Sequence, residues 1–481
     1  MILKYALSFL LMIPTAAQAT SIDWAGGYRF EWTEVDRPSL TTPGQRKAYG
    51  LHHLYLSPRI IASDGVNIYS KFHILGSQDS AYQYSQAGDI WGGGLPRTPN
   101  PKDTTDVDSS RNNVFAKNQR QTPIQVSQLY LTVDQENGVF FAGRMPLEFG
   151  LGMTYNLGNG PFDHWLNSRD MVGFKFLVDN ITIQPMFGRQ YDENYGQGNN
   201  IQDQMIHLQY DNKDSGNLLG LLYEQRKGSV AVNDAPLATM TGINGPGVVD
   251  GDFSTQRTSF MLGKSWSGFA FKFEGSFLSG STGIKNAKGN NVKVNGYGLA
   301  AELYFPNPSS SVASQWEWKI RIGLATGDDP TTDDYEGFQF DKNYDVAFLM
   351  FNHRLGQKDF FSTNLVKDTT AGRNNSNSID DEAIGNAAYF SPQLKYMWSD
   401  KFDLIQTVTA AQLIANPTNA TDFNKTVGFE YDVELLYKMR ERVSWSNQIG
   451  LFFPGAAFKD GQTGLETANT WGLASRIAIT F

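Results

Sequence analysis

The chain repeats one pattern along almost its whole length, an alternation of apolar and polar residues with a period of two. In QWEWKIRIGL, at 315–324, tryptophan, isoleucine and leucine side chains alternate with Glu317, Lys319 and Arg321. This alternation predicts a β-strand with one apolar and one polar face. The segments run for about 9–14 residues. Strands of globular sheets usually have ~5–6 residues, whereas tilted strands that cross a membrane need ~9–11. These segments are therefore long enough to cross a membrane.

Eighteen such segments can be traced, beginning near residues 22, 49, 65, 124, 137, 170, 180, 201, 217, 254, 268, 293, 315, 385, 401, 424, 442 and 467. The links between them alternate in length. Short links such as DN at 179–180 consist of turn residues, whereas long links include 78–123, 146–169 and 326–384. Tight turns at one rim and long loops at the other are typical of an outer-membrane barrel.

A sheet can cross a membrane only when it closes on itself, because lipid offers no hydrogen-bond partner to an open edge. With both termini on the side of the short turns, the strand number must be even. The sequence therefore predicts an all-β fold, a transmembrane antiparallel β-barrel of about 18 strands (16–18), with short periplasmic turns and long extracellular loops. An 18-strand barrel is wide enough for an aqueous channel, and we expect one of the loops 78–123 and 326–384, preferentially 326–384, to lie partly inside it.

The N-terminus has the features of a secretory signal peptide. Lys4 precedes the apolar stretch YALSFLLMI, and AQA at 17–19 fits a cleavage site between small residues. The expected organisation is a signal peptide at 1–19 and a single barrel domain at 20–481, which places the mature protein in the outer membrane of a Gram-negative-type cell.

The C-terminus ends on an aromatic residue with apolar residues at alternate positions before it. The residues of this face are Trp471, Leu473, Ile477, Ile479 and Phe481. The ending resembles that of outer-membrane proteins, whose terminal aromatic residue is recognised by the barrel assembly machinery. The resemblance implies that these residues form the membrane-insertion signal.

Composition excludes several other classes of protein. The formal charge of −9 is spread along the chain without a Lys/Arg cluster, which argues against nucleic-acid binding. The chain has no cysteine, its six histidines are scattered, and no G-x-S-x-G motif occurs, so a structural zinc site and a nucleophile elbow are not expected. We therefore expect no cofactor. The acidic loop residues Asp328, Asp329, Asp333 and Asp334 could bind calcium, although a solvated loop explains them as well.

Three further stretches resemble a narrower family. They are GRMPLEFGLGMTYNLGNG at 143–160, followed by DHWLNSRDMVGFKF, then LATGDDPTTDD at 324–334 and GLFFPGAAF at 450–458. Together they resemble outer-membrane barrels of the alginate-export type and related porin-like proteins, from about residue 137 onward. The resemblance implies an eighteen-stranded channel and, for the exporter itself, an arginine-rich pore, to which only Arg144 and Arg169 correspond here.

The predicted lumen is close to electrical balance, with eight inward-facing basic residues and seven acidic ones among the strands. Strong anion selectivity needs an excess of positive charge, so alginate is not favoured as a substrate. The residues expected to line the path are Arg144, Lys175, Glu317, Lys319, Arg321, Glu430, Asp432 and Arg476.

The sequence thus predicts a porin-like channel that allows small hydrophilic solutes to diffuse across the outer membrane, without enzymatic activity. The expected partners are outer-membrane lipid, lipopolysaccharide, the assembly machinery and the solutes, and a monomer is favoured over a trimer. The alternatives are a polysaccharide exporter of the alginate-export type, a barrel-embedded hydrolase, for which His73 and His207 are the candidates, and a plugged structural barrel. The sequence leaves open the solute, the direction of transport and the ion selectivity.

Overall fold

The computed structural model describes residues 21–42, 44, 46–74, 85–86, 124–189, 202–229, 248–249, 252–285, 290–306, 315–329, 331–356, 360, 383–417, 423–459 and 467–481. Within these ranges no helix is long and apolar enough to cross a membrane. The expected signal peptide at 1–19 and nearly all of the loop 78–123 lie outside the described residues.

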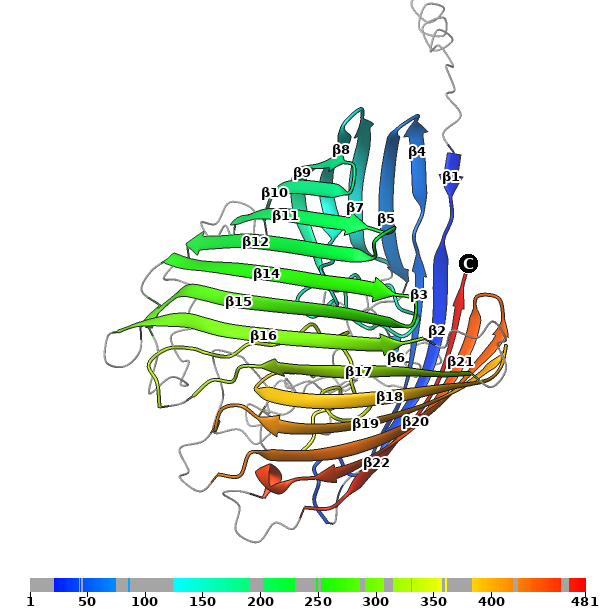
Figure 1. Ribbon diagram of the computed structural model, residues 1–481, viewed down its shortest axis with the longest axis vertical. Helices are drawn as coiled ribbons and strands as arrows, with labels where there is room; N and C mark the ends of the chain where they lie inside the picture. The colour runs from blue at the N-terminus through cyan, green and yellow to red at the C-terminus, as the bar shows by residue number, and fades with distance from the viewer. Residues whose placement is uncertain are drawn as a thin grey trace, which may run out of the picture.

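Eighteen antiparallel strands pair in chain order, and β2 pairs with β22, so the sheet closes into a barrel (Figure 1). They are β2 (Gly26–Val35), β3 (Lys47–Leu56), β5 (Val66–Ile74), β7 (Ile124–Gln135), β8 (Gly138–Pro146), β9 (Ser168–Val178), β10 (Ile181–Arg189), β11 (Gln202–Asn212), β12 (Asn217–Ser229), β14 (Asp252–Trp266), β15 (Phe269–Lys285), β16 (Asn291–Phe305), β17 (Gln315–Ala325), β18 (Ala387–Ser399), β19 (Phe402–Leu413), β20 (Thr426–Arg440), β21 (Val443–Pro454) and β22 (Thr470–Thr480). Each of the eighteen predicted starts lies within four residues of one of these strands.

Four short strands and one turn of 3₁₀ helix complete the described fold. The short strands are β1 (Ser21–Asp23), β4 (Arg59–Ser63), β6 (Ser85–Gln86) and β13 (Val248–Val249), and the helical turn is Ala456–Phe458. β4 follows β3 after a two-residue break and takes over its pairing with β5. It therefore continues the wall of the barrel rather than adding a nineteenth strand.

The seam of the barrel joins the two ends of the chain. β2 and β22 are paired from Gly27↔Thr480 to Val35↔Gly472. Beyond this ladder, the backbone N–H of Phe481 donates to the carbonyl of Gly26 at 3.0 Å. Leu473, Ile479 and Phe481 are exposed on the outer face, as the alternation predicts. Recognition of this strand by the assembly machinery stays a prediction.

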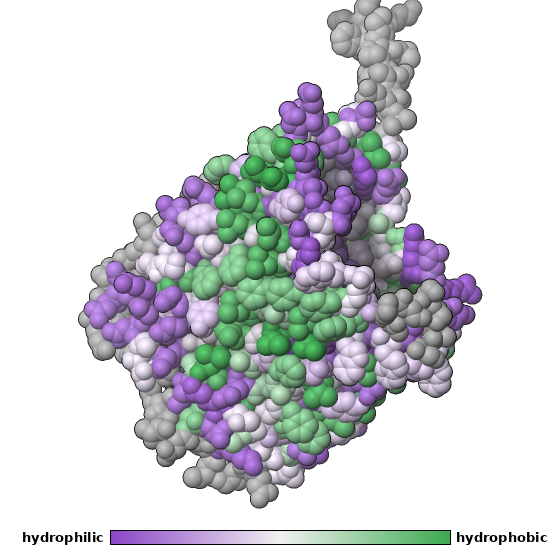
Figure 2. Space-filling model, viewed as in Figure 1, coloured by the Kyte–Doolittle hydropathy of each residue, from purple (hydrophilic) through white to green (hydrophobic). Residues whose placement is uncertain are grey.

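The outer surface is an apolar belt. Figure 2 shows a hydrophobic band across the middle of the strands, with hydrophilic residues toward both strand ends on the face in view. Phe277 and Trp318 are exposed on this outer face, whereas Glu274, on the opposite face of the same strand as Phe277, is completely buried. The alternation read from the sequence therefore separates the lipid face from the lumen face.

One residue departs from the predicted alternation. Val427 precedes the exposed Phe429 by two residues on β20, so strict alternation places it on the outer face, but it is completely buried. The pairing register between β19 and β20 shifts at Ala411 and Gln412, and Gly428 has a φ of +125°. A bulge of this kind adds a residue to one strand and reverses the side-chain face, so Val427 points into the barrel.

Within the described residues, segments of two loops fold into the lumen. L3 denotes residues 147–167, between β8 and β9, and L7 denotes residues 326–386, between β17 and β18. The described part of L7 contributes Phe348, Leu349 and Met350 to a buried apolar cluster with wall residues, which confirms the expectation that the loop 326–384 lies partly inside. L3 contributes Phe149 and Tyr155 to a second cluster. That contribution was not predicted.

Candidate channel and its constricting loops

L7 is anchored by a carboxylate on β20. Glu430 is completely buried and accepts hydrogen bonds from three consecutive backbone N–H groups, those of Phe348 (3.0 Å), Leu349 (2.5 Å) and Met350 (2.6 Å). Asp432 also accepts from Phe348, at 3.1 Å. A buried carboxylate needs such donors, because its desolvation is costly otherwise. Glu430 and Asp432 were expected to line the path. The structure corrects this expectation, because L7 covers both side chains.

The carbonyl groups of the same segment of L7 are bound from β17, β18 and β19. Val346 accepts hydrogen bonds from the hydroxyls of Ser391 (2.9 Å) and Thr409 (2.8 Å). The Arg321 guanidinium donates to the carbonyls of Asp345 and Val346. The predicted lumen residue Arg321 thus faces inward but binds the loop. Donors and acceptors on the wall match the buried carbonyl and N–H groups of this turn.

L3 is anchored in the same way on β15. Glu274 is completely buried and accepts from the backbone N–H groups of Leu151 (2.7 Å), Met153 (3.1 Å) and Thr154 (2.9 Å). Next to it, the Tyr155 hydroxyl donates to Glu224 at 2.5 Å. Burial raises the pKa of Tyr155, so this hydroxyl keeps its proton and acts as a donor to the wall.

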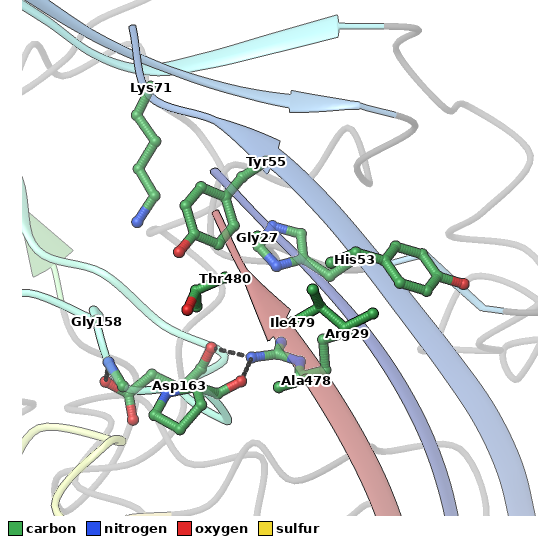
Figure 3. Close-up of a pocket in the computed structure, with 13 residues that line it drawn as sticks. Gly27, Arg29, His53, Tyr55, Lys71, Gly158, Asp163, Ala478, Ile479 and Thr480 are labelled. Atoms are coloured by element: carbon green, nitrogen blue, oxygen red, sulfur yellow. Dashed lines mark hydrogen bonds between the residues drawn. The ribbon is translucent and has the colours of Figure 1, made fainter. Parts of the chain in front are cut away.

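The far end of L3 contacts the opposite wall of the barrel. Arg29 of β2 donates to the carbonyls of Pro161 (3.3 Å) and Asp163 (2.7 Å), as Figure 3 shows. His164 lies 2.8 Å from Glu31 of β2, and the Arg476 guanidinium of β22 lies 4.7 Å from the centre of the Phe162 ring. β2 and β22 are nearly opposite β15 in the ring of strands. L3 therefore crosses the lumen.

L3 and L7 also bind each other. The side chain of Asn343 in L7 accepts from the backbone N–H of Trp165 (3.1 Å) and donates to its carbonyl (2.7 Å). The Lys342 ammonium lies 3.8 Å from the centre of the Trp165 ring, within cation–π distance. A backbone hydrogen bond of 2.7 Å joins Asp341 to Met153. The two loops thus form one continuous partition inside the barrel.

A second part of the lumen wall, on β16 to β20, carries charged side chains that remain accessible to water. Lys319 is 2.9 Å from Glu302, and Lys395 is 3.3 Å from Glu317. The lysine side chains are 34% and 30% exposed, although they lie on the face opposite the outer tryptophans. Inward-facing charges that contact water indicate an aqueous interior.

The remaining predicted path residues lie in different places. Lys175 lines a cavity between L3 and the wall. Arg144 pairs with Asp170 at 2.7 Å and shares its face of β8 with the exposed Phe140, whereas Phe141, on the other face, belongs to a buried lumen cluster. The structure therefore corrects the expectation for Arg144, which lies on the outer face near the end of β8.

The acidic residues of L7 bind their own loop and its neighbour. Asp329 accepts from the backbone N–H of Thr331 at 2.9 Å, Asp328 from that of Glu336 and Asp334 from that of Lys293. In the part of the chain that the structure describes, no three acidic or histidine side chains come together as a metal site. The calcium hypothesis therefore gains no support from this arrangement.

The histidines considered for a hydrolytic site are separated. His73 is buried in a chain with His53 (2.8 Å) and Ser127 (2.6 Å) in the wall formed by β3, β5 and β7. His207 lines the cavity beside L3. The two residues therefore do not act in one site.

Comparisons with solved structures identify the fold. The chain is similar to Pseudomonas aeruginosa OccK9 (OpdG), with a TM-score of 0.51 and 9% identity over 96% of this chain and 98% of that one. It is similar to Pseudomonas aeruginosa OpdL, with a TM-score of 0.51 and 7% identity over 96% and 99%. Acinetobacter baumannii OccAB3 has a TM-score of 0.50 and 9% identity over 96% and 99%. No family model and no curated protein matches the sequence. The chain thus has the eighteen-stranded fold of outer-membrane porins.

Proposed function

We propose that the protein is an outer-membrane channel through which small hydrophilic solutes diffuse. The observation that carries this proposal is the set of charged lumen side chains, such as Lys319 and Lys395, that are about one-third exposed inside a closed, externally apolar barrel. A water-filled interior behind an apolar belt is the physical requirement for solute diffusion across lipid. The porin fold supports the same conclusion.

The partition of L3 and L7 would then set the constriction. It reduces the accessible part of the lumen to the region that the loops leave free, bordered by the paired charges of β16 to β20. Because Lys319 pairs with Glu302 and Lys395 with Glu317, the wall carries no focused excess of one sign there. We therefore propose weak charge selectivity, with solute size and polarity as the main filters.

Planar-bilayer recording tests the proposal directly. The purified protein should form discrete conductance steps, and the reversal potential in a tenfold salt gradient should stay close to zero. Absence of conductance from heat-modifiable, folded protein would contradict a channel. A strongly anion-selective pore would instead support the exporter alternative, which nothing in the fold comparisons favours.

The hydrolase alternative has a separate test. Ser127, His73 and His53 form a hydrogen-bonded chain, but both histidines are at least 95% buried, which argues against substrate access. Ester or peptide turnover by the purified protein that disappears in Ser127→Ala would establish this alternative.

A further inference from the structure

A cavity of about 400 Å³ lies between L3 and the lumen wall formed by β8 to β14. Its volume falls within the ~300–1,000 Å³ typical of small-molecule binding sites. Its lining is mixed. Apolar side chains come from Leu147, Phe149, Leu157, Leu218 and Leu222 and from four methionines, Met145, Met186, Met205 and Met261, and polar ones come from residues such as Tyr155, Gln184, His207 and Gln209. The cavity thus offers a ligand both an apolar and a polar surface.

The methionines come from separate strands and meet because of the register. Met186 of β10 and Met205 of β11 are direct cross-strand partners, and both are nearly buried. Met261 of β14 lies over Gly220 of β12, where a Cβ atom would come within 2.5 Å of the Met261 methyl group. Gly220 therefore lets the thioether extend across β12 toward β11. Thioether sulfur makes favourable contacts with aromatic rings.

Among the described polar groups at the border of the cavity, one buried ring nitrogen has no hydrogen-bond partner. The Nε2 atom of His207 is buried and makes no hydrogen bond within the described residues. Gln184 is the direct cross-strand partner of His207, and Gln209 and Lys175 lie nearby in the lining. A buried nitrogen without a partner in a cavity indicates a place where a ligand hydroxyl could bind.

The charge of the lining argues against an anionic ligand. The carboxylates of Glu148 and Asp211 outnumber the single ammonium group of Lys175. A charged group against the apolar part of the lining would lose hydration without a matched partner. An uncharged compound with an aromatic ring and a hydroxyl group fits this lining, because the ring can contact the apolar side chains and the hydroxyl can bind the polar groups.

We infer that this cavity is a binding site for uncharged, hydroxyl-bearing aromatic solutes, held by the methionines and by His207. The inference rests on the proposed channel function and deepens it, because a site beside the constriction would let such solutes enter the partition between L3 and L7. Polar solutes without a ring would pass the charged wall of β16 to β20 and gain nothing from the cavity.

Isothermal titration calorimetry on the detergent-solubilised protein tests the inference, with 4-hydroxybenzyl alcohol as the probe and empty micelles as the blank. Saturable binding of the alcohol is expected, with at least tenfold weaker binding of 4-hydroxybenzoate and no binding of cyclohexane-1,3,5-triol. Equal binding of the benzoate, tighter binding of the cation tyramine, or no saturable binding of the alcohol would overturn it.

The double variant Met186→Gln, Met205→Gln keeps the side-chain length and should weaken binding of the alcohol about tenfold. The matched control is Met397→Gln, a lumen-facing methionine on β18 outside the cavity, which should bind like the wild type. His207→Phe keeps an aromatic ring but removes both ring nitrogens, and it should weaken binding of the alcohol more than binding of toluene. Unchanged binding in the double variant contradicts the inference.

The bilayer recording separates this inference from the proposed function. Conductance without binding of the alcohol would leave the channel intact and remove the aromatic site. Binding without conductance would keep the site and remove the channel.

Discussion

L3 and L7 are both held inside the barrel, but by different interactions. Each inserts a turn into the barrel and places three backbone N–H groups on one buried glutamate, Glu274 for L3 and Glu430 for L7. L7 then packs a large apolar cluster against the wall, whereas L3 continues across the lumen to Arg29 and Glu31. L7 is therefore held mainly by apolar burial against the strands from β16 to β22 and β2, and L3 mainly by polar contacts at two opposite sides of the barrel.

A loop inside the lumen thus needs two kinds of stabilisation, namely hydrogen bonds to a buried glutamate and a second set of contacts with the wall. Salt does not screen apolar burial, whereas it weakens ion pairs and charge-assisted hydrogen bonds that are accessible to solvent. We therefore expect that substitutions of Glu430 change the mean conductance of the channel, and that substitutions along L3 change its current noise.

The largest effect is expected for Glu430→Leu. The substitution leaves the N–H groups of Leu349 and Met350 buried without their acceptor, at a cost of ~1–3 kcal/mol for each group, whereas the N–H of Phe348 keeps Asp432. L7 should leave the lumen, and the single-channel conductance should rise severalfold. Glu430→Gln, which keeps one acceptor oxygen, should have a smaller effect. Unchanged conductance in Glu430→Leu would show that L7 does not constrict the path.

Glu274→Leu removes the equivalent anchor of L3 and sharpens the comparison. Because the far end of L3 remains bound to Arg29 and His164 remains beside Glu31, we expect increased open-channel current noise with a modest rise in mean conductance. In the double variant Glu274→Leu, Arg29→Gln, L3 also loses its contact with Arg29. The mean conductance should then rise further and the current noise should fall. If Glu274→Leu alone raised the mean conductance as much as Glu430→Leu, the two loops would be held equally strongly.

The junction between the loops predicts a pH dependence. Burial raises the pKa of Asp341 in L7 from 3.8 to about 6. A carboxyl group whose pKa is higher in the folded state stabilises that state fully below its unfolded pKa, and this contribution is lost as the pH rises through about 6. Current noise should therefore be lowest near pH 4 and increase toward pH 7. In Asp341→Asn this pH dependence should disappear. A current noise that does not change with pH in the wild type would show that Asp341 does not control the contact between L3 and L7.

The smallest effect is expected at the charged wall. Lys319→Glu replaces one member of the pair with Glu302 and should shift the reversal potential toward cation selectivity by a few millivolts, more at low salt because screening is weaker. The control is Lys401→Glu in the turn between β18 and β19. If both variants shift the potential equally, the wall at Lys319 does not border the path.

Much of the fold could be predicted because alternation is a local property. The starts of all eighteen strands, the seam at Phe481 and the inward faces of Glu317, Lys319 and Arg321 follow from which residues alternate with which. Arg144 shows the limit of local reading, because it was assigned to the lumen from its motif rather than from the alternation with Phe140 and Phe141.

The sequence by itself determined which face of each strand meets lipid, since a period of two is written in neighbouring residues. Only the tertiary structure decided which inward-facing charges meet water and which are covered by a loop. Glu317 and Glu430 look alike in sequence, yet the first borders the solvated wall and the second holds a turn from residues 80–82 positions away. Contacts over such separations depend on where L3 and L7 lie inside the closed barrel, and the local alternation of residues does not predict these positions.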